Sequence, residues 1–362
     1  MQAREESSMK YKNIVEGRFL RKLNRFTVEV EVNGEIKLAH LPTTARLREL
    51  LIPGAKCYLE EALNKKRKTP YTLISIEKNG EILNIVSTVA NDLVYEKIIG
   101  EEILTDLKIK DLKKEVTYSH SRFDFGFTTI DGEEGFIEVK SVNLKRNNIS
   151  MFPGSPTERG RKHLIELADA KMEGKASVLV IVVLFEEMDF FTANIATDPL
   201  WSKELLKSLE RGVEIFAFSS RVTKDSIELK DKIEVNLGYS IEDSKDKNNY
   251  IFKNKTKALA SFSLKEISMT NSKNKTCDRD NVFNEDYLLL SEIETYDCSE
   301  KDFTTLISFI EQKTSDLKLD ILKIELGSGK NDLENILNRL NYKEVKFAYN
   351  NRNKLFEKFI DK

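Results

Sequence analysis

The stretch SRFDFGFTTIDGEEGFIEVKSVNL, residues 121–144, decides the fold of the central part of this chain. Residues 122–129 are rich in Phe and Thr, which favour β-strands, and residues 136–144 form a second strand-like run. The segment DGEEG at 131–135 supplies residues that favour turns. The sequence therefore predicts a β-hairpin.

Three charged residues lie inside the two strands of this hairpin: Asp124, Glu138 and Lys140. Side chains alternate between the faces of a strand, so Glu138 and Lys140 share one face and Val139 points to the other. Antiparallel pairing can bring Asp124 opposite or diagonal to them. We therefore expect two carboxylates and one lysine to meet on a sheet surface that is otherwise apolar.

This trio suits a magnesium-dependent phosphodiesterase site. Mg²⁺ takes oxygen ligands, usually one or two carboxylates completed by water and substrate phosphate. A bound ion lowers the pKa of its water and stabilises charge on the phosphate, and a nearby lysine can hold the attacking water or offset phosphate charge. An ordinary ion pair between Glu138 and Lys140 is the alternative, because the spacing E-x-K is common on solvated strands.

The chain of 362 residues is long enough for two or three domains. No apolar run approaches the ~20 residues that span a bilayer, and the start MQAREESSMKYK lacks the apolar core of a signal peptide. The spacing of Cys57, Cys277 and Cys298 matches neither a zinc site nor a disulfide framework. These features predict a cytoplasmic protein without a membrane partner.

The distribution of charge indicates where a nucleic acid would bind. The formal net charge of −2 argues against a protein that coats nucleic acid. However, the first 75 residues contain 15 Lys and Arg but only nine Asp and Glu, with basic clusters at 18–25 and 65–68. This asymmetry predicts a phosphate-contacting surface in the N-terminal part.

The pattern of strands and helices predicts an α/β multidomain protein. Short strands with Asn-Gly turns at 33–34 and 79–80 suit a five-stranded OB-like barrel, with a short helix at 45–51. After it we expect helices at 91–99 and 101–112, then the hairpin, then an amphipathic helix capped by Thr157. The apolar strand ASVLVIVVLF follows, which predicts a mixed central sheet.

Several longer motifs point to a known family: GRFLRKLNRFTVEVEV at 17–32, SRFDF at 121–125, FIEVKSVNL at 136–144, MFPGSPTERGRKHL at 151–164 and DPLW at 198–201. Over residues 10–237 the chain resembles the sugar fermentation stimulation protein family. The resemblance implies an OB-like nucleic-acid-binding domain at 10–86 and a restriction-endonuclease-like domain of the PD-(D/E)xK nuclease superfamily at 87–237. It also implies DNA binding and a link to sugar-utilisation genes.

Carried over by position, the resemblance makes Asp124 and Glu138 metal ligands and Lys140 the motif lysine, with Mg²⁺ or Mn²⁺ as the ion. Glu115 matches an upstream acidic position, where an auxiliary metal ligand and a surface carboxylate are equally compatible.

Three residues depart from the family pattern. Thr43 and Ala45 stand where Asn and Gly are usual, and Leu184 stands where Gln is frequent. The first two put a binding turn in doubt, and the third a polar contact near the metal.

Basic residues form the expected nucleic-acid surface: Arg18, Arg21, Lys22, Arg25, Arg46, Lys68, Arg159, Lys162 and His163. The first four are interleaved with Phe19 and Phe26, which suits backbone contacts plus base stacking. A solvated strand edge with phenylalanines in the core is the alternative. The last three begin a helix, whose N-terminus attracts phosphate. For His163, a half-exposed helix position is the alternative.

Residues 245–362 alternate strands and helices and predict a third α/β domain, which resembles the tail of GNAT-type acetyltransferases. In such enzymes a glycine-rich turn holds the acetyl-CoA pyrophosphate. Here the turn TYDCSEKDF has no glycine and three acids, so we expect a degenerate domain that binds no CoA and contacts a protein partner.

Besides an acyl-CoA-dependent activity of the C-terminal domain, which we do not expect, two functions remain open. The first is a DNA-binding, metal-dependent nuclease. The second is a non-catalytic DNA-binding regulator of sugar-utilisation genes that keeps the nuclease fold as a platform. RNA as a further ligand and a homodimer are compatible with both.

Overall fold

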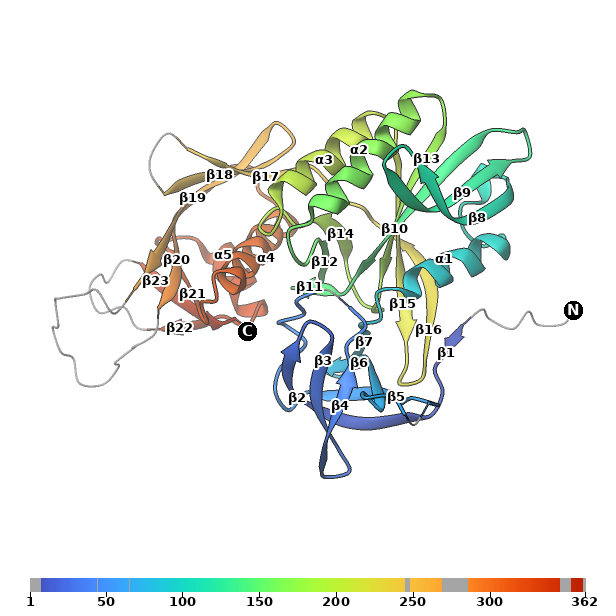
Figure 1. Ribbon diagram of the computed structural model, residues 1–362. Coiled ribbons are helices and arrows are strands. Elements are labelled where there is room, and N and C mark those ends of the chain that lie inside the picture. Colours follow the sequence, from blue (N-terminus) through green and yellow to red (C-terminus); the bar gives the residue numbers. More distant parts are fainter. Residues whose placement is uncertain are drawn as a thin grey trace, which may run out of the picture. The chain divides into compact units, whose positions relative to one another are not determined.

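The computed structural model describes residues 8–43, 45–64, 66–244, 248–268, 286–345 and 353–360 (Figure 1). The chain divides into two compact units. The first comprises Met1–Ala193 and Leu200–Asn236, and the second comprises Asn194–Pro199 and Leu237–Lys362. Within the described residues, no helix is both long enough and apolar enough to cross a membrane.

A small closed barrel begins the first unit (blue in Figure 1). Its strands are β2 (Ile14–Asn24), β3 (Thr27–Val32), β4 (Glu35–His40), β5 (Lys56–Glu61), β6 (Tyr71–Lys78) and β7 (Glu81–Asn84). They lie in the order β4-β3-β2-β5-β6-β7, and a parallel pairing of β4 with β6 closes the barrel. Val28, Val30 and Val32 alternate into its core, as period-two spacing requires. The predicted OB-type barrel is confirmed.

The short helix predicted at 45–51 is wrong, because these residues form only a turn. The N–H groups of Leu50 and Leu51 both donate to the carbonyl of Leu47, whose own φ is +51°. Leu47 and Leu50 are buried in the barrel, and Pro53 follows two residues after the turn, so no second helical turn can form.

A seven-stranded mixed sheet forms the centre of the first unit, in the order β1-β16-β15-β13-β10-β9-β8. Its strands are β1 (Met9–Lys10), β8 (Ile109–Tyr118), β9 (Ser121–Thr129), β10 (Glu134–Val142), β13 (Ala176–Val183), β15 (Glu214–Val222) and β16 (Ser226–Ile233). Every residue of β13 is buried, as its apolar sequence predicts. A small sheet of β11 (Leu144–Arg146), β12 (Ile149–Phe152) and β14 (Phe190–Ala193) lies beyond β10 in the chain.

Helices cover both faces of the central sheet: α1 (Val89–Ile99), α2 (Glu158–Met172) and α3 (Pro199–Glu210). α1 packs in a core cluster with Phe125 and Val139, whereas α2 contacts the opposite face of β10 through His163 and Glu138. Figure 1 shows α1 and α2 on opposite sides of β10.

The helix predicted at 101–112 is wrong. Only a 3₁₀ turn, Thr105–Leu107, forms there, and the strand β8 begins at Ile109. β8 pairs along almost its whole length with β9, so pairing with the hairpin overrides the local helical pattern.

One buried asparagine ties the barrel to the central sheet. The amide of Asn84 in β7 donates to the hydroxyl of Tyr11 at 2.9 Å, and its main-chain N–H donates to the carbonyl of Leu184 at 2.9 Å. The N–H of Tyr11 in turn donates to the carbonyl of Asp225, beside β16. Asn84 thus links β7 to the segments that directly follow β1 and β13, which lie far from it in the chain.

We expect Asn84→Ala to lower the free energy of unfolding of the first unit by about 1–3 kcal/mol, because it leaves the partly buried hydroxyl of Tyr11 without its donor. Urea unfolding followed by the fluorescence of Trp201, the single and fully buried tryptophan, measures this change. Asn335→Ala, at an exposed helix position, is the control and is expected to change stability by less than about 0.5 kcal/mol. Equal stability of the two variants would contradict the prediction.

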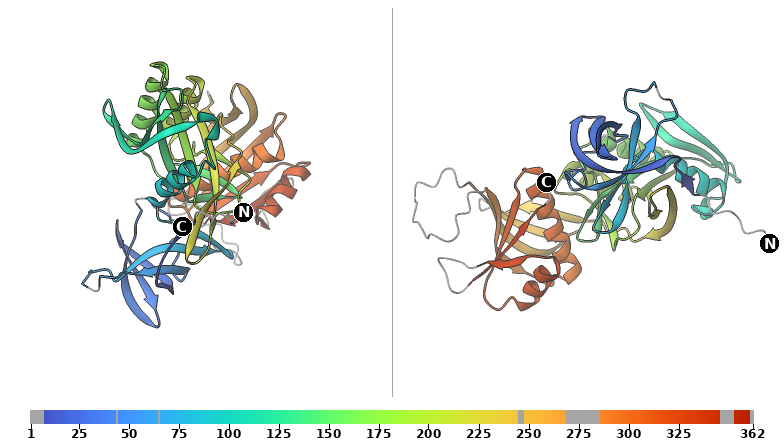
Figure 2. Two further views of the ribbon diagram at one scale, coloured as in Figure 1. Left: turned by 90° about the vertical axis from the view of Figure 1, so that its right-hand side faces the viewer. Right: turned by 90° about the horizontal axis from the view of Figure 1, so that it is seen from below.

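The second unit is an α/β domain, as predicted. Its strands are β17 (Tyr239–Asp243), β18 (Asn249–Asn254), β19 (Lys257–Ile267), β20 (Tyr287–Thr295), β21 (Ile321–Leu326), β22 (Lys343–Val345) and β23 (Lys354–Phe359). They form one sheet in the order β17-β18-β19-β20-β21-β23-β22, accompanied by α4 (Glu300–Asp316) and α5 (Asn331–Arg339). Figure 2 gives two further views of these elements, in orange and red.

The turn TYDCSEKDF leads into α4 and serves as its cap. Ser299 and Asp302 bond reciprocally to each other's main-chain N–H groups in a capping box. Cys298 in this turn is partly buried, Cys57 is buried in the barrel, and Cys277 lies outside the described residues.

Candidate functional site

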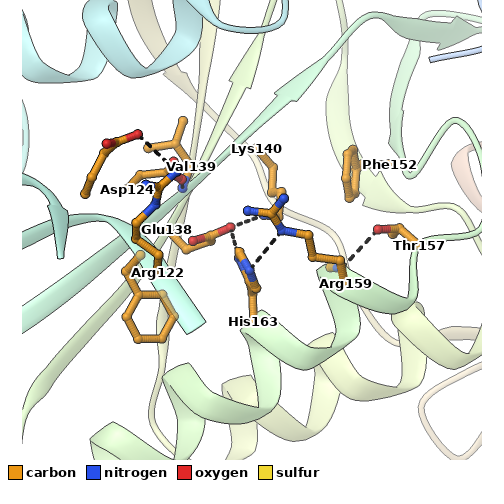
Figure 3. Close-up of a pocket in the computed structure, with 12 residues that line it drawn as sticks. Arg122, Asp124, Glu138, Val139, Lys140, Phe152, Thr157, Arg159 and His163 are labelled. Atoms are coloured by element: carbon orange, nitrogen blue, oxygen red, sulfur yellow. Dashed lines mark hydrogen bonds and ion pairs between the residues drawn. The ribbon is translucent and has the colours of Figure 1, made fainter. Parts of the chain in front are cut away.

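The predicted hairpin forms and brings the charged trio together. β9 and β10 pair antiparallel, with Phe125 opposite Ile137, which sets Asp124 opposite Glu138. Glu138 and Lys140 lie on the same face, and Lys140 donates to Oε1 of Glu138. Figure 3 shows the side chains of this site and the pocket they line.

Two donors hold the carboxylate of Asp124. Oδ1 accepts a hydrogen bond from the side chain of Asn91 in α1 at 2.7 Å, and Oδ2 accepts one from the N–H of Val139 at 2.7 Å. Burial, and next the charge of Glu138, raise the pKa of Asp124 above its usual range, although these hydrogen bonds and Lys140 act the other way. Asp124 is therefore a fixed carboxylate in an environment that disfavours its charge.

A local break in the sheet makes this arrangement possible. Pairing of β9 with β10 stops at Phe125, so the N–H of Val139 is available to the side chain of Asp124. On the other side, β8 pairs through Lys114 and Val116, which leaves Glu115 opposite Asp124 with a φ of +57°. Such left-handed backbone is uncommon for a non-glycine residue and often marks a functional site.

Glu138 is the most buried member of the trio, with only 1% of its surface exposed. Oε1 accepts from Lys140 and lies 2.5 Å from Nδ1 of His163, whereas Oε2 is buried without a hydrogen-bond partner among the described residues. Burial alone would raise the pKa of Glu138, but the charge of Lys140 and the contact with His163 outweigh it and hold the pKa below its ordinary value.

His163 reaches Glu138 from the first turns of α2. Nε of Arg159 donates to Nε2 of His163 at 3.4 Å, so Nδ1 carries the ring proton and donates to Glu138. The two residues are four positions apart and share one helix face, and the hydroxyl of Thr157 caps the helix by accepting from the N–H of Gly160. Figure 3 shows Arg159 and His163 reaching from this helix toward Glu138.

A cavity of about 250 Å³ contains these groups. Its wall is formed by residues of β8, β9, β10, the end of β12 and the start of α2: Glu115, Arg122, Phe123, Asp124, Glu138, Val139, Lys140, Phe152, Thr157, Arg159, Gly160 and His163. The predicted Asp124, Glu138, Lys140, Glu115, Arg159 and His163 therefore meet in one place. The side chain of Glu115 is 66% exposed and pairs with Arg122 at 3.4 Å.

The other predicted basic residues lie elsewhere. Lys162 lies in a neighbouring groove with Arg161 and His120, and its amine donates to the carbonyl of His120 at 3.1 Å. Arg18, Arg21, Lys22, Arg25, Arg46 and Lys68 are exposed on the barrel. Part of the second basic cluster, Lys65, lies outside the described residues.

Asn91 and Arg122 also belong to the site, although neither is among the residues predicted from the sequence. A signal for Asn91 exists: it lies three positions before Val94 and seven before Ile98, on the apolar stripe of α1. A polar residue in such a stripe indicates a buried polar partner, but only the fold shows that the partner is Asp124. Arg122 is an exposed strand residue without such a signal.

Comparisons with known proteins give a consistent result. The N-terminal OB domain of SfsA matches residues 20–85, and the sugar fermentation stimulation protein RE domain matches residues 88–226. The sugar fermentation stimulation protein homolog of Clostridium tetani is 39% identical over 226 residues, which are 62% of this chain and 98% of that protein. The homolog of Alkaliphilus oremlandii is 38% identical over 231 residues, 63% of this chain and 98% of that protein.

The chain is also similar to solved structures of other proteins. The structure of Pyrococcus furiosus SfsA in complex with Ca²⁺ is 30% identical and covers 63% of this chain and 98% of its own, with a TM-score of 0.58. A probable acetyltransferase from Staphylococcus epidermidis covers 31% of this chain and 66% of its own, at 11% identity and a TM-score of 0.24.

Proposed function

Because this chain belongs to the sugar fermentation stimulation protein family, with an OB domain followed by the family's RE domain, we propose that it binds DNA and hydrolyses phosphodiester bonds with a divalent cation. The observation that carries the proposal is the buried Oε2 of Glu138, which lacks a hydrogen-bond partner beside the fixed carboxylate of Asp124. A buried carboxylate oxygen without a donor is rare in folded proteins and fits a cation ligand.

The donor set fits Mg²⁺ or Mn²⁺. Asp124 and Glu138 would hold the ion, which would acidify a bound water and stabilise charge on the phosphate. In the described part of the chain no three acidic, His or Cys side chains are grouped to hold a metal alone, so water and substrate phosphate would complete the shell, as is usual for Mg²⁺. The solved relative from P. furiosus is described as a complex with Ca²⁺, another cation that prefers oxygen ligands.

The chain's own residues have distinct roles in this proposal. Asn91 and the N–H of Val139 orient Asp124. His163 orients Glu138 by binding Oε1, the oxygen that also accepts from Lys140, and this leaves Oε2 available to a cation. Lys140 holds the attacking water or offsets phosphate charge. Arg159, at the capped N-terminus of α2, contacts the phosphate backbone.

The direct test incubates the purified full chain with labelled single-stranded DNA, duplex DNA and RNA, in Mg²⁺, Mn²⁺ or EDTA. We expect cleavage of DNA that requires the metal. An inert protein on all substrates in both metals would exclude the nuclease.

One observation favours the second candidate, a DNA-binding regulator without catalysis. Lys140 and His163 both bond to one oxygen of Glu138, which is how a purely structural buried cluster would satisfy its charges. This candidate predicts salt-dependent DNA binding that is lost when the arginines at 18, 21 and 25 are replaced but is insensitive to Lys140→Ala.

A positioning role for Asn91 gives a further prediction. We expect Asn91→Ala to lower metal-dependent cleavage by about 10- to 100-fold, because partners that orient a metal ligand have effects of this size. Burial already raises the pKa of Asp124, and losing the bond from Asn91 raises it further. In a plot of cleavage rate against pH, the fall in rate on the acidic side should therefore occur at a higher pH than in the wild type.

The control for this prediction is Glu96→Ala, an exposed position on the same helix. This variant should change neither the cleavage rate nor the pH at which the rate falls on the acidic side. If the rate of Asn91→Ala falls at the same acidic pH as that of the wild type, the positioning role is contradicted, even if the rate itself is lower.

A further inference from the structure

One end of the barrel presents an exposed aromatic ring on a firmly held backbone. The side chain of Phe26, between β2 and β3, is 47% exposed. Its N–H donates to the side chain of Asn24 at 2.9 Å, and its carbonyl accepts from the N–H of Leu41 at 2.9 Å. An exposed ring that is already fixed loses little entropy when it binds a ligand, so Phe26 is suited to recognition.

Two other flat groups flank this ring. The guanidinium carbon of Arg25 lies 5.3 Å from the ring centroid, and the ring of His40 in β4 stacks at 6.5 Å and 29°. Nδ1 of His40 is also 3.2 Å from the carbonyl of Phe26, which fixes the pair. We call Arg25, Phe26 and His40 the Phe26 platform. Stacked flat groups of this kind bind the face of an unpaired base.

Positive charge without a partner lies at the same end of the barrel. Arg21 bonds to Glu29 at 2.6 Å, and the guanidinium of Arg18, whose cross-strand neighbour is Glu31, donates to the carbonyl of Gly54 at 3.1 Å. Lys22 and Arg25, by contrast, have no ion pair with any described residue. Desolvation and the charge of Arg25 both lower the pKa of Lys22, as expected for two nearby cations without an anion between them.

An apolar row continues from the Phe26 platform along β4. Ile36 and Leu38 alternate with buried or paired neighbours and share the face of His40. They are 66% and 38% exposed, respectively. Large aliphatic side chains so exposed beside an aromatic ring form a surface on which bases can lie.

We propose that the Phe26 platform binds single-stranded DNA, with one unpaired base stacked on Phe26 and the adjoining phosphates held by Lys22 and Arg25. The inference rests on the proposed function, which makes DNA the ligand, and adds that the strand is unpaired at the barrel. In a duplex the base faces are covered by their neighbours, so a stacking surface has nothing to contact. An acidic protein partner would match the two cations but would leave the ring and its stacked neighbours unexplained.

The test measures binding of the full chain to fluorescein-labelled 15-mers by anisotropy, in EDTA so that no cleavage occurs. The ligands are dT15, an abasic strand of equal length and charge, a duplex, and rU15. We expect Phe26→Ala to weaken dT15 binding roughly tenfold, because base stacking on one aromatic side chain is worth about that much, and to leave the abasic strand unchanged. Leu63→Ala, which removes another exposed apolar side chain of the barrel, is the control and should change neither.

A second variant keeps the ring and reports its contact. Trp201 is fully buried, so its emission forms a constant background for a new tryptophan in Phe26→Trp. We expect dT15 to bind this variant normally and to quench the new emission, and the abasic strand to bind without quenching.

Equal dT15 affinity for the wild type and Phe26→Ala would overturn the proposal, as would tighter binding of the duplex or of rU15 than of dT15. Because these measurements need no catalysis, a failure here leaves the cleavage test untouched. Conversely, an inert cleavage site would not change the expected loss on Phe26→Ala.

Discussion

Replacing Asp124 with alanine is expected to reduce metal-dependent DNA cleavage roughly a thousandfold or more, because a catalytic metal lowers the barrier by several kcal/mol and in the proposed site would lose one of its two carboxylate ligands. DNA affinity in EDTA should stay within about twofold of the wild type, since Asp124 lies in the cavity rather than among the exposed cations of the barrel. Cleavage rate and affinity are measured on the same preparations.

Metal binding gives a readout for Asp124→Ala that does not depend on activity. A ligand that binds only the folded state raises its melting temperature, so Mn²⁺ should raise that of the wild type but not that of the variant. Glu133→Ala removes an exposed acid from the same hairpin and should keep both cleavage and the Mn²⁺ effect. If Mn²⁺ stabilises Asp124→Ala as much as the wild type, the metal assignment is wrong.

Replacing Lys140 with methionine is expected to slow cleavage by about 100-fold or more, comparable to the loss of one preorganised donor at a charged transition state. Methionine keeps most of the side-chain volume but removes the charge that faces Glu138. DNA affinity should not change. Lys113→Met, at an exposed position of the neighbouring edge strand, is the control and should cleave normally. Because DNA binding of Lys140→Met is expected to be unchanged for both candidates, the absence of cleavage by the wild type is the result that would favour the regulator instead.

The same variant has a distinct effect on stability. Lys140 helps to hold the pKa of Glu138 below its ordinary value of 4.5, against the effect of burial. The ionised Glu138 therefore stabilises the folded wild type above the unfolded pKa, and this contribution is lost as the pH falls through the lower folded pKa. We expect Lys140→Met to be less stable by about 3 kcal/mol at pH 7 and the difference to shrink at pH 4 and below. Urea unfolding at several pH values measures it, and a pH-independent difference would contradict the assignment.

The site trio was predictable because it depends on one local rule. Alternation along β10 places Glu138 and Lys140 on one face whatever the rest of the fold does, and a short turn leaves few registers for Asp124. The contribution of Asn91 was not predictable in this way. Its contact with Asp124 depends on the angle at which α1 crosses the sheet, which is set by the packing of many side chains.

The two phenylalanines of β2 and its turn show a different limit. Phe19 is 2% exposed and Phe26 is 47% exposed, so one belongs to the core and the other to the surface. The register of β2 against β3 shifts between Phe19 and Arg21 and again between Lys22 and Asn24. Each bulge reverses which residues face inward, so alternation read from the sequence fails for the residues between the two bulges, whereas beyond the second bulge the two reversals cancel and Phe19 and Phe26 again lie on opposite faces.

The wrong prediction of a helix at 101–112 has a different reason. Its charged and apolar residues fit a helical stripe, but β8 is an edge strand whose lysines face solvent. Edge strands carry such charges to avoid pairing with other chains, and the same charges resemble the polar face of a helix. The pairing of β8 with β9, which the local sequence does not reveal, decides between a strand and a helix here.

The pairing of β1 with β16 determines the order in which the first unit can be completed during synthesis. Met9 pairs with Ile227, 218 positions later, so β1 has no partner until nearly the whole unit has been translated. At about 5–20 residues per second, this delay lasts roughly 10–45 s. The barrel, whose strands all lie within residues 14–84, has every partner long before then. The barrel can thus form early on the ribosome, whereas the central sheet is completed last, when β16 becomes available to pair with β1.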